Sequence, residues 1–288
     1  MTKNLNLLVV LLLLIAGCGS KEKETPSGLK FTVLRNGDGK LPASGQVIVF
    51  DYSLKDDKDS TWTNTWEEGV PAASQIADSS RLAEEDGMTQ MFRMLSAGDS
   101  VTTSMTLGKF FRKIVRSNPP AELDTAQILT YVLAVKEITT VEGYLAKREP
   151  QVFNRDNRNI ETFLERNKIQ TTRDTTGLRY IMYSNLGGVK PKLGDCIEVK
   201  YLGRFLRNGR VFDGAESASF PLTENLIQGW QIGLPLLGKG DSATFFVPSR
   251  LAYGQQGYAS VPPDAVLIFD IKLLDVKKDF DPNTRTCK

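Results

Sequence analysis

Histidine is absent from all 288 residues of the chain. Without an imidazole, the sequence cannot build a Ser-His-Asp triad, a Cys-His dyad or a histidine-ligated zinc site. It also lacks a Cys-x-x-Cys pair and a phosphate-binding glycine loop, so we expect no metal and no other cofactor. Acidic and basic residues are interspersed, and the formal net charge is +2. No basic patch indicates a nucleic-acid partner.

No apolar run reaches the roughly 20 residues that span a membrane. A shorter run, Leu5 to Ile15, follows Lys3 and leads into Ala16-Gly17-Cys18. This arrangement resembles a bacterial lipoprotein signal and lipobox, which implies that residues 1–17 are a cleaved signal peptide and that Cys18 is lipidated. Several acyl chains would give stable anchoring, whereas one alone is marginal. The alternative is an ordinary secretory signal that happens to contain Cys18.

Residues 18–27 are polar and charged without apolar periodicity, which predicts a flexible tether. We therefore expect the protein in the bacterial cell envelope, attached to a membrane through the lipid on Cys18. The absence of Asp after this cysteine resembles lipoproteins of the outer membrane that face the periplasm. The Lys-Glu run at 21–24 leaves the cell surface open as a second location.

Cysteine is scarce, and apart from Cys18 only Cys196 and Cys287 are present. In an oxidising compartment these two residues could form a disulfide. Two independent thiols are an equally open alternative, because Cys287 is the penultimate residue and chain ends are often mobile.

The chain contains an internal repeat. Each half carries a Gly-Asp pair that lies ten residues after one bulky residue and thirteen residues before another. These residues are Met88, Gly98-Asp99 and Phe111 in the first half, and Trp230, Gly240-Asp241 and Tyr253 in the second. Similar strand-like stretches flank them, Ile48–Tyr52 and Ile197–Tyr201 upstream, and those containing Tyr131 and Phe269 downstream. The repeat predicts two related domains, at residues 28–140 and 177–277.

Local patterning predicts an α+β fold in which each antiparallel sheet wraps around a short helix. Ile197, Val199 and Tyr201 alternate with polar residues, and so does the segment from Leu267 to Leu273, so one face of each strand should be buried. Gln228 to Leu234 can form about two helical turns, which Pro235 should end.

Residues 141–176 separate the two domains and predict a partly helical connector. Ile160, Phe163 and Leu164 fall at helical spacing. The accompanying charges predict a solvated helix face, and they are Arg155, Asp156, Arg158, Glu161, Glu165 and Arg166. Residues 278–288 remain as a C-terminal tail.

Between Tyr201 and Phe269 lies a widely spaced set of aromatic and β-branched residues. The set comprises Tyr201, Phe212-Asp213, Phe220, Leu226 to Trp230, Tyr253-Gly254, Val261 to Pro263 and Phe269. Its order and spacing resemble the FKBP family of peptidyl-prolyl isomerases, the immunophilins that bind tacrolimus and rapamycin, over residues 177–277. The resemblance implies rotation about Xaa-Pro bonds, a reaction that needs neither a nucleophile nor a proton acceptor, because its barrier is amide resonance.

The resemblance assigns a role to individual residues. The expected catalytic set is Tyr201, Phe212, Asp213, Ile227, Trp230, Tyr253 and Phe269, and the expected substrate-binding set is Phe220, Leu226, Tyr258 and Val261. Trp230 should carry the substrate proline ring, while the Ile227 N–H and the Tyr253 hydroxyl each hold a substrate carbonyl and Asp213 lies at the rim. The sequence departs from the family pattern at Leu226, where valine is usual, and at Tyr258, where histidine is frequent.

The first domain keeps the spacing of the repeat but lacks the expected site residues. Met88 takes the tryptophan position and Phe111 the tyrosine position, and no Phe-Asp pair follows Tyr52. Trp62 and Trp66 lie in additional sequence, either as a partner site or, more simply, packed onto the sheet. We interpret this domain as a degenerate copy used for binding, spacing or stability.

Two functions fit these observations. The first is a lipid-anchored peptidyl-prolyl isomerase that assists exported, proline-containing polypeptides and binds a tacrolimus-like macrolide. The second is a non-catalytic chaperone or binding lipoprotein that uses the same fold to hold chains.

Overall fold

The structure, a computed structural model, describes residues 21–288 except 116, 282 and 285. The expected signal peptide and Cys18 therefore lie outside the described residues. The chain divides into two compact units near Tyr144, with residues 68–70 grouped with the second unit. Across the described part of the chain, no helix is both long and apolar enough to cross a membrane.

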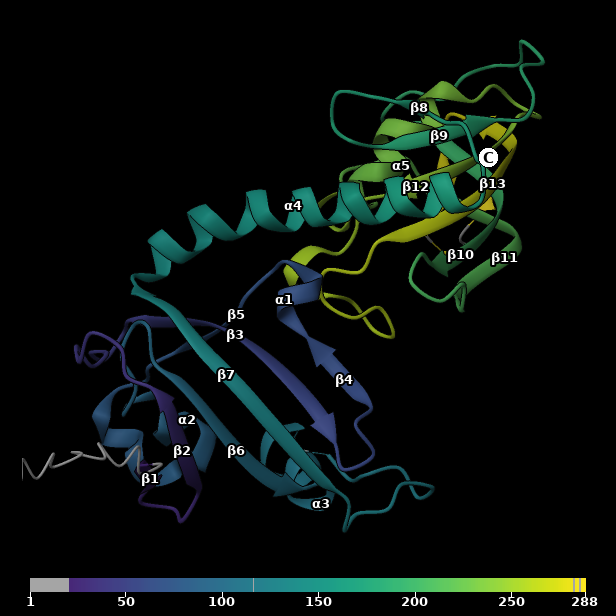
Figure 1. Ribbon diagram of the computed structural model, residues 1–288. Coiled ribbons are helices and arrows are strands. Elements are labelled where there is room, and N and C mark those ends of the chain that lie inside the picture. Colours follow the sequence, from purple (N-terminus) through teal and green to yellow (C-terminus); the bar gives the residue numbers. More distant parts are fainter. Residues whose placement is uncertain (1–20, 116, 282, 285) are drawn as a thin grey trace, which may run out of the picture. The chain divides into compact units, whose positions relative to one another are not determined.

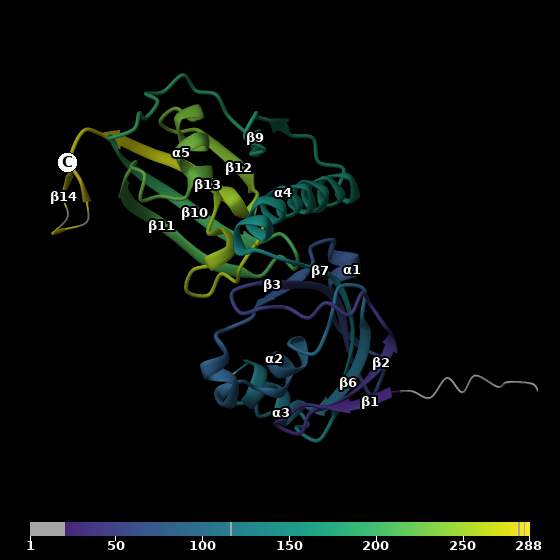
Figure 2. The ribbon, with the colours of Figure 1, turned by 90° about the vertical axis from the view of Figure 1, so that its left-hand side faces the viewer.

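The first unit is built on one antiparallel sheet of order β1-β2-β6-β7-β3-β4, with β5 also paired to β3. Its strands are β1 Lys21–Glu24, β2 Lys30–Arg35, β3 Val47–Asp56, β4 Thr61–Asn64, β5 Ala72–Gln75, β6 Ser100–Thr106 and β7 Ile128–Thr139. Its short helices are α1 Thr65–Glu68, η1 Ser79–Glu84, α2 Gly87–Phe92, α3 Leu107–Phe110 and the π-helical turn η2 Phe111–Val115. Strands β3, β7 and β6 run side by side (Figure 1), and α2 lies on one side of this sheet (Figure 2). Met88 and Met91 of α2 belong to the buried core of the unit.

The second unit repeats this plan with a sheet of order β11-β10-β13-β12-β9-β8. Its strands are β8 Thr172–Arg173, β9 Arg179–Met182, β10 Cys196–Phe205, β11 Val211–Pro221, β12 Ser242–Val247, β13 Leu267–Lys277, β14 Phe280–Asp281 and β15 Thr286–Cys287. Its helices are α4 Val141–Arg166, which begins in the first unit, α5 Gln228–Gly233 and the 3₁₀ turns η3 Leu234–Leu236, η4 Ser249–Leu251 and η5 Gly254–Gln256. The expected helix therefore forms at Gln228, and Pro235 lies where it tightens into a 3₁₀ turn.

The α+β fold expected from the sequence is confirmed, and the repeat has a physical basis. The buried carboxylate of Asp99 accepts hydrogen bonds from the backbone N–H of Gly37 and of Ser96, both at 2.6 Å. The carboxylate of Asp241 does the same with Leu186 and Gly238, both at 2.8 Å. These hydrogen bonds lower the pKa of Asp241 below its ordinary value. We refer to the Asp99 and Asp241 networks as the aspartate locks.

The buried faces follow the predicted alternation in part. Leu267, Phe269, Ile271 and Leu273 face the core around α5. Ile268, on the opposite face of β13, is also buried, at 3% exposure. It packs with Phe246 against Ile160 and Leu164 of α4, a helix that runs beside β12 and β13 (Figure 1). The expectation that only one face of each strand is buried was therefore wrong here.

Three expected solvent-exposed segments are ordered instead. Lys21–Glu24 of the expected tether forms β1, an edge strand paired to β2. The expected C-terminal tail forms the β14-β15 pair, and Cys287 is bonded to Cys196. Asp156, which was expected on a solvated face of the connector, is fully buried. The two strand pairs are local hairpins, whereas Cys287 and Asp156 find their partners far along the chain, in Cys196 and Ser249.

Candidate functional site

An aromatic cluster forms between α5 and the sheet of the second unit. The Trp230 ring makes edge-to-face contacts with Tyr201, Phe220 and Phe269, at centroid distances of 5.2, 5.8 and 5.4 Å. Phe212 makes a further edge contact with Phe269 at 5.7 Å. Such edge-to-face pairs add to the stabilisation from area burial. The structure thus brings together the five aromatic residues that the sequence placed in one pocket.

Local sequence explains how the cluster is positioned. Strand β10 pairs with β13 so that Gly203 lies opposite Phe269. A side chain at Gly203 would collide with both rings, because a Cβ there would lie 2.7 Å from Phe212 and 3.0 Å from Phe269. Sequence reasoning did not single out Gly203, since its importance depends on two rings that arrive from other strands.

The cluster has a buried floor and a partly exposed rim. Trp230, Val261 and Phe269 are exposed by 5%, 6% and 3%, respectively. The remaining expected residues, apart from Asp213 and Tyr258, are half-buried and pack against the same core, and they are Tyr201, Phe212, Phe220, Leu226, Ile227 and Tyr253. The side chains around Trp230 are therefore overwhelmingly apolar.

Two tyrosines and one carboxylate supply the polar groups at the rim. The Tyr201 hydroxyl donates to Asp213 Oδ2 at 2.8 Å, and Asp213 Oδ1 accepts from the Gly214 N–H at 2.8 Å. Burial raises the pKa of Tyr201 well above its ordinary value, and the hydrogen bond and charge of Asp213 raise it further. Burial likewise raises the pKa of Tyr253, with smaller contributions from Asp213 and Tyr258. Both phenols therefore remain protonated donors at neutral pH.

Donors at the cluster lack acceptors within the described residues. Ile227 is the N-cap of α5, and neither its backbone N–H nor the Tyr253 hydroxyl forms a hydrogen bond there. The indole N–H of Trp230 is buried and has no hydrogen-bond partner among the described atoms. Ile227 and Tyr253 are half-buried, so an external acceptor can reach these two donors, whereas the Trp230 N–H is enclosed in the core.

The loop after β12 completes the rim. Tyr258 is 68% exposed, but its ring stacks on Tyr253 with centroids 5.4 Å apart and an interplanar angle of 12°. The turn depends on Gly257, whose φ is +64° and where a Cβ would lie 2.5 Å from the Val261 carbonyl oxygen. Tyr258 thus lies outside the buried cluster and contacts it through Tyr253.

Helix α4 anchors this loop through buried polar groups that sequence reasoning missed. Asp156 Oδ2 accepts from the backbone N–H and the hydroxyl of Ser249, at 2.8 and 2.5 Å. Arg155 donates to the Asp264 carbonyl at 2.9 Å, and Arg148 pairs with the Asp264 carboxylate. Ser249 and Asp264 bracket the segment that carries Tyr253 and Tyr258. The i, i+4, i+8 spacing of Asp156, Ile160 and Leu164 was the only sequence signal for this contact.

The described residues contain no group of three or more Asp, Glu or Cys side chains that could hold a metal ion. The site thus consists of an aromatic floor, hydrogen-bond donors without acceptors and one rim carboxylate. A site of this kind can bind a flat apolar ring and the carbonyl groups beside it.

Comparison with known proteins identifies the class to which this sheet and site belong. Residues 187–274 match the family model of the FKBP-type peptidyl-prolyl cis-trans isomerases. FK506-binding protein 1 of Saccharomyces cerevisiae is 36% identical over 96 residues, which cover 31% of this chain and 83% of the yeast protein. The chain belongs to the FKBP-type peptidyl-prolyl cis-trans isomerase family.

Bacterial relatives that are longer than the yeast protein match over only part of their length. The FKBP-type isomerase FkpA of Aeromonas hydrophila is 42% identical over 107 residues, 36% of this chain and 39% of the relative. The crystal structure of FkpA from Escherichia coli aligns at 33% identity with a TM-score of 0.40, covering 47% of this chain and 65% of the other. The chain therefore spans about two fifths of the length of the Aeromonas relative.

Proposed function

We propose that the second domain catalyses cis-trans isomerisation of Xaa-Pro bonds in polypeptides. The observation that carries this proposal is the arrangement of Trp230 within a ring of aromatic side chains, next to the unpaired Ile227 N–H and Tyr253 hydroxyl. A substrate proline would rest on the indole, and the two donors would bind the carbonyl groups on either side of it. Tyr201, held by Asp213, fixes one wall.

Catalysis would come from the environment rather than from proton transfer. Rotation of the Xaa-Pro bond passes through a twisted amide with less charge separation between oxygen and nitrogen than the planar ground state has. An apolar, water-poor site favours the twisted form over the planar form. The raised pKa values of Tyr201 and Tyr253 fit this mechanism, because it needs these phenols as neutral donors and not as bases.

Protease-coupled isomerisation of an Xaa-Pro tetrapeptide by the full chain tests this proposal. We expect a rate enhancement that a tacrolimus-like macrolide inhibits, because the macrolide should occupy the Trp230 site. Suppression of aggregation without any rate enhancement would instead support the alternative, a non-catalytic chaperone. EDTA should leave turnover unchanged.

We also propose that the protein is an envelope lipoprotein whose clients are exported polypeptides. The disulfide between Cys196 and Cys287 supports an oxidising compartment, where such bonds persist. The sequence around Cys18 supports a lipid anchor. Cys18→Ser should release the protein from membranes during fractionation, and a variant that stays bound after a high-salt wash would exclude this anchor.

A further inference from the structure

The C-terminal residues of the second domain turn back after β13 (Figure 2) and lie beside β10 and β11. Strands β14 and β15 pair with each other, and Cys287 of β15 forms a disulfide with Cys196, the first residue of β10. Just before β14, the Lys278 ammonium forms an ion pair with Asp195 at 2.8 Å. We refer to Lys278, β14 and β15 as the C-terminal brace. It holds the turn at 194–196 by a covalent bond and an ion pair.

The same turn anchors a part of the functional site. Leu222, which is fully buried, donates its N–H to the Asp195 carbonyl at 2.8 Å, and its own carbonyl accepts from the Gly194 N–H at 2.9 Å. Cys196 lies opposite Pro221 in the β10-β11 pair. The C-terminal brace and the chain around Leu222 are therefore attached to the same turn.

Residues 220–227, which we call the site segment, carry three of the expected site residues. Phe220 contacts the Trp230 ring, Leu226 packs in the same core, and Ile227 provides an unpaired N–H. Substrate binding requires that all three groups stay in place, because a displaced contact contributes little to affinity.

Beyond β11, the site segment depends on this turn for its position. Its hydrogen bonds after Leu222 stay, in the described chain, within residues 221–231. One of them joins the Gln231 side chain to the Leu226 carbonyl at 2.6 Å. A movement of the turn would therefore be passed through Leu222 to the site segment.

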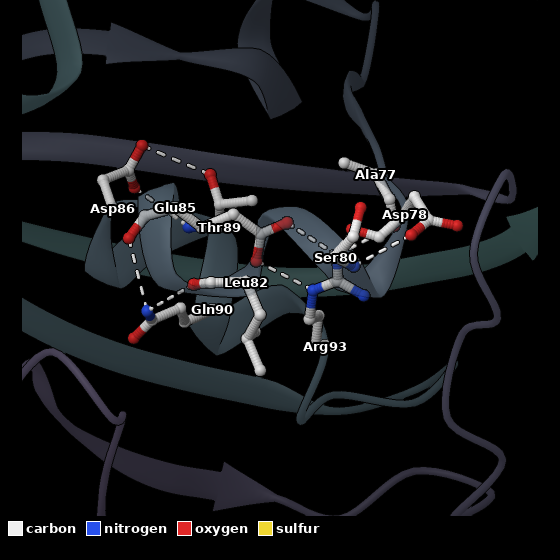
Figure 3. Close-up of polar contacts among 9 residues, drawn as sticks. All are labelled: Ala77, Asp78, Ser80, Leu82, Glu85, Asp86, Thr89, Gln90 and Arg93. Atoms are coloured by element: carbon white, nitrogen blue, oxygen red, sulfur yellow. Dashed lines mark hydrogen bonds and ion pairs between the residues drawn. The ribbon is translucent and has the colours of Figure 1, made fainter.

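The first domain holds the equivalent segment in a different way. Ile76, at the position of Leu222, makes the same two backbone hydrogen bonds, both at 2.8 Å, with the turn before β3. Val47, the first residue of β3, takes the place of Cys196, so a disulfide cannot form there. The polar contacts that hold the segment come instead from its own helix, α2, and from the residue that ends it (Figure 3).

These contacts lie close together and are largely shielded from solvent. Arg93, at the end of α2, pairs with Glu85 at 2.6 Å, with side chains that are 17% and 7% exposed, and it also donates to the Ala77 carbonyl at 2.8 Å. Gln90 donates to the Leu82 carbonyl at 3.2 Å. Each domain thus has its own means of fixing the segment that leads into its short helix, and in the second domain the C-terminal brace supplies it.

We propose that the C-terminal brace positions the site segment of the second domain. Cys196, Cys287 and Lys278 are then positioning residues for isomerisation, although they lie outside the aromatic cluster. Without the disulfide the turn moves more freely, so the Phe220 ring and the Ile227 N–H are less often in place and substrate binding weakens. This inference rests on the proposed function, since it concerns the same site.

The test compares the full chain with its Cys287→Ser variant at a temperature where circular dichroism shows that both are folded. We expect KM for an Xaa-Pro tetrapeptide to rise about threefold with little change in kcat, because the site segment binds the planar and the twisted amide alike. Inhibition by a tacrolimus-like macrolide should weaken by a similar factor. In hydrogen-exchange mass spectrometry, residues 220–227 should exchange faster than in the wild type, whereas residues 253–261, which α4 anchors, should not change.

Leu164→Ala is the matched control. Leu164 is 5% exposed and packs with Phe246 and Ile268 on the opposite face of the sheet. Its truncation should therefore lower the melting temperature of the same domain without reaching the turn. We expect this variant to keep the wild-type KM and the wild-type exchange at residues 220–227, so that a loss of stability is separated from a loss of positioning.

Reduction of the wild type gives the same comparison from an already folded protein, which keeps the test valid if Cys287→Ser does not fold. Dithiothreitol passes two electrons and two protons to the disulfide, which yields two cysteine thiols and the cyclic disulfide of the reagent. Once mass spectrometry shows that the Cys196–Cys287 bond is open, KM should rise as in the variant. The variant itself should not respond to the reagent.

An unchanged KM after loss of the disulfide would overturn the inference. Unchanged exchange at residues 220–227, or an equal rise of KM in Leu164→Ala, would overturn it as well. If the wild type does not isomerise the tetrapeptide, the proposed function fails, and hydrogen exchange alone then decides whether the C-terminal brace holds the site segment.

Discussion

The two domains share one hydrogen-bonded scaffold but differ in what they place next to their short helix. In the second domain, Trp230 lies among three other rings and beside donors that have no acceptor in the described chain. In the first, Met88 occupies the matching position, and the nearby aromatics pack on one another. Trp62 packs against this core and makes an edge-to-face contact with Phe110 at a centroid distance of 6.5 Å, whereas Trp66 is 45% exposed. The comparison shows that the hydrogen-bonded scaffold specifies the fold. A few positions next to the short helix determine which side chains and donors are brought together.

The largest expected effect comes from substitution at the matched helix positions. Trp230→Ala should lower the isomerisation rate by about 100-fold and the unfolding free energy of the second domain by roughly 3–5 kcal/mol, because it removes the buried floor of the site. Met88→Ala should cost the first domain about 2–5 kcal/mol and leave isomerisation unchanged. Tetrapeptide assays, after circular dichroism confirms folding, measure both. A similar loss of activity in the two variants would contradict the proposed division.

Asp156→Ala should have the next largest effect. It leaves Arg155 and Ser249 without their buried partner, which should destabilise the second domain by about 3–5 kcal/mol. In the folded protein the loop that carries Tyr253 should be less well positioned, so kcat/KM should also fall. Urea denaturation and kinetics measure these effects. Glu165→Ala, on the exposed face of α4, should change stability by less than about 0.5 kcal/mol, and an equal effect of the two substitutions would refute the role of Asp156.

Removal of the disulfide should affect only the second domain. Cys287→Ser opens a covalent loop that joins positions 91 residues apart, and we expect a loss of about 2–4 kcal/mol. Differential scanning calorimetry with and without a reducing agent measures it. The reducing agent should shift the melting of the wild type but not that of the variant. A shift in both proteins would mean that the reductant acts elsewhere.

The smallest expected effect comes from single hydroxyl groups. Tyr253→Phe removes one hydrogen bond to substrate, worth about 0.5–1.5 kcal/mol, and should lower kcat/KM several-fold. The reciprocal change, Phe111→Tyr, should give the first domain no activity, because the residues around Met88 form no comparable ring. It can be tested in the Trp230→Ala background, where any recovered activity would have to come from the first domain.

Patterns within short stretches predicted much of the second domain. The alternation in β13 and the helix at Gln228 depend on neighbouring residues, so the sequence showed them directly. The spacing of Trp230, Tyr201, Phe220 and Phe269 predicted their proximity through family resemblance. Their roles in binding a substrate stay predictions.

Features that depend on a partner element, and not on their own sequence pattern, were missed. In the sequence, Asp156 is one of several charged residues on α4. Only its contact with Ser249, far along the chain, shows that it is a buried acceptor. Lys21–Glu24 is polar, yet β2 supplies a strand edge with which it pairs. The spacing of Cys196 and Cys287 could not decide whether they pair, because that depends on the β14-β15 hairpin returning to β10 and β11. Four additional residues between Ile76 and Met88, relative to Leu222 and Trp230, also gave no hint that η1 would form there.

The aspartate locks have a consequence for how such a protein can diverge after duplication. Each lock joins a turn, a strand and the end of a helix through backbone groups, and none of its bonds uses a side chain from the Trp230 cluster. Mutations at those positions therefore leave the lock intact. A duplicated copy can therefore exchange its interior residues while selection on folding preserves the hydrogen-bonded frame. One half of the chain can change in this way without destabilising the other.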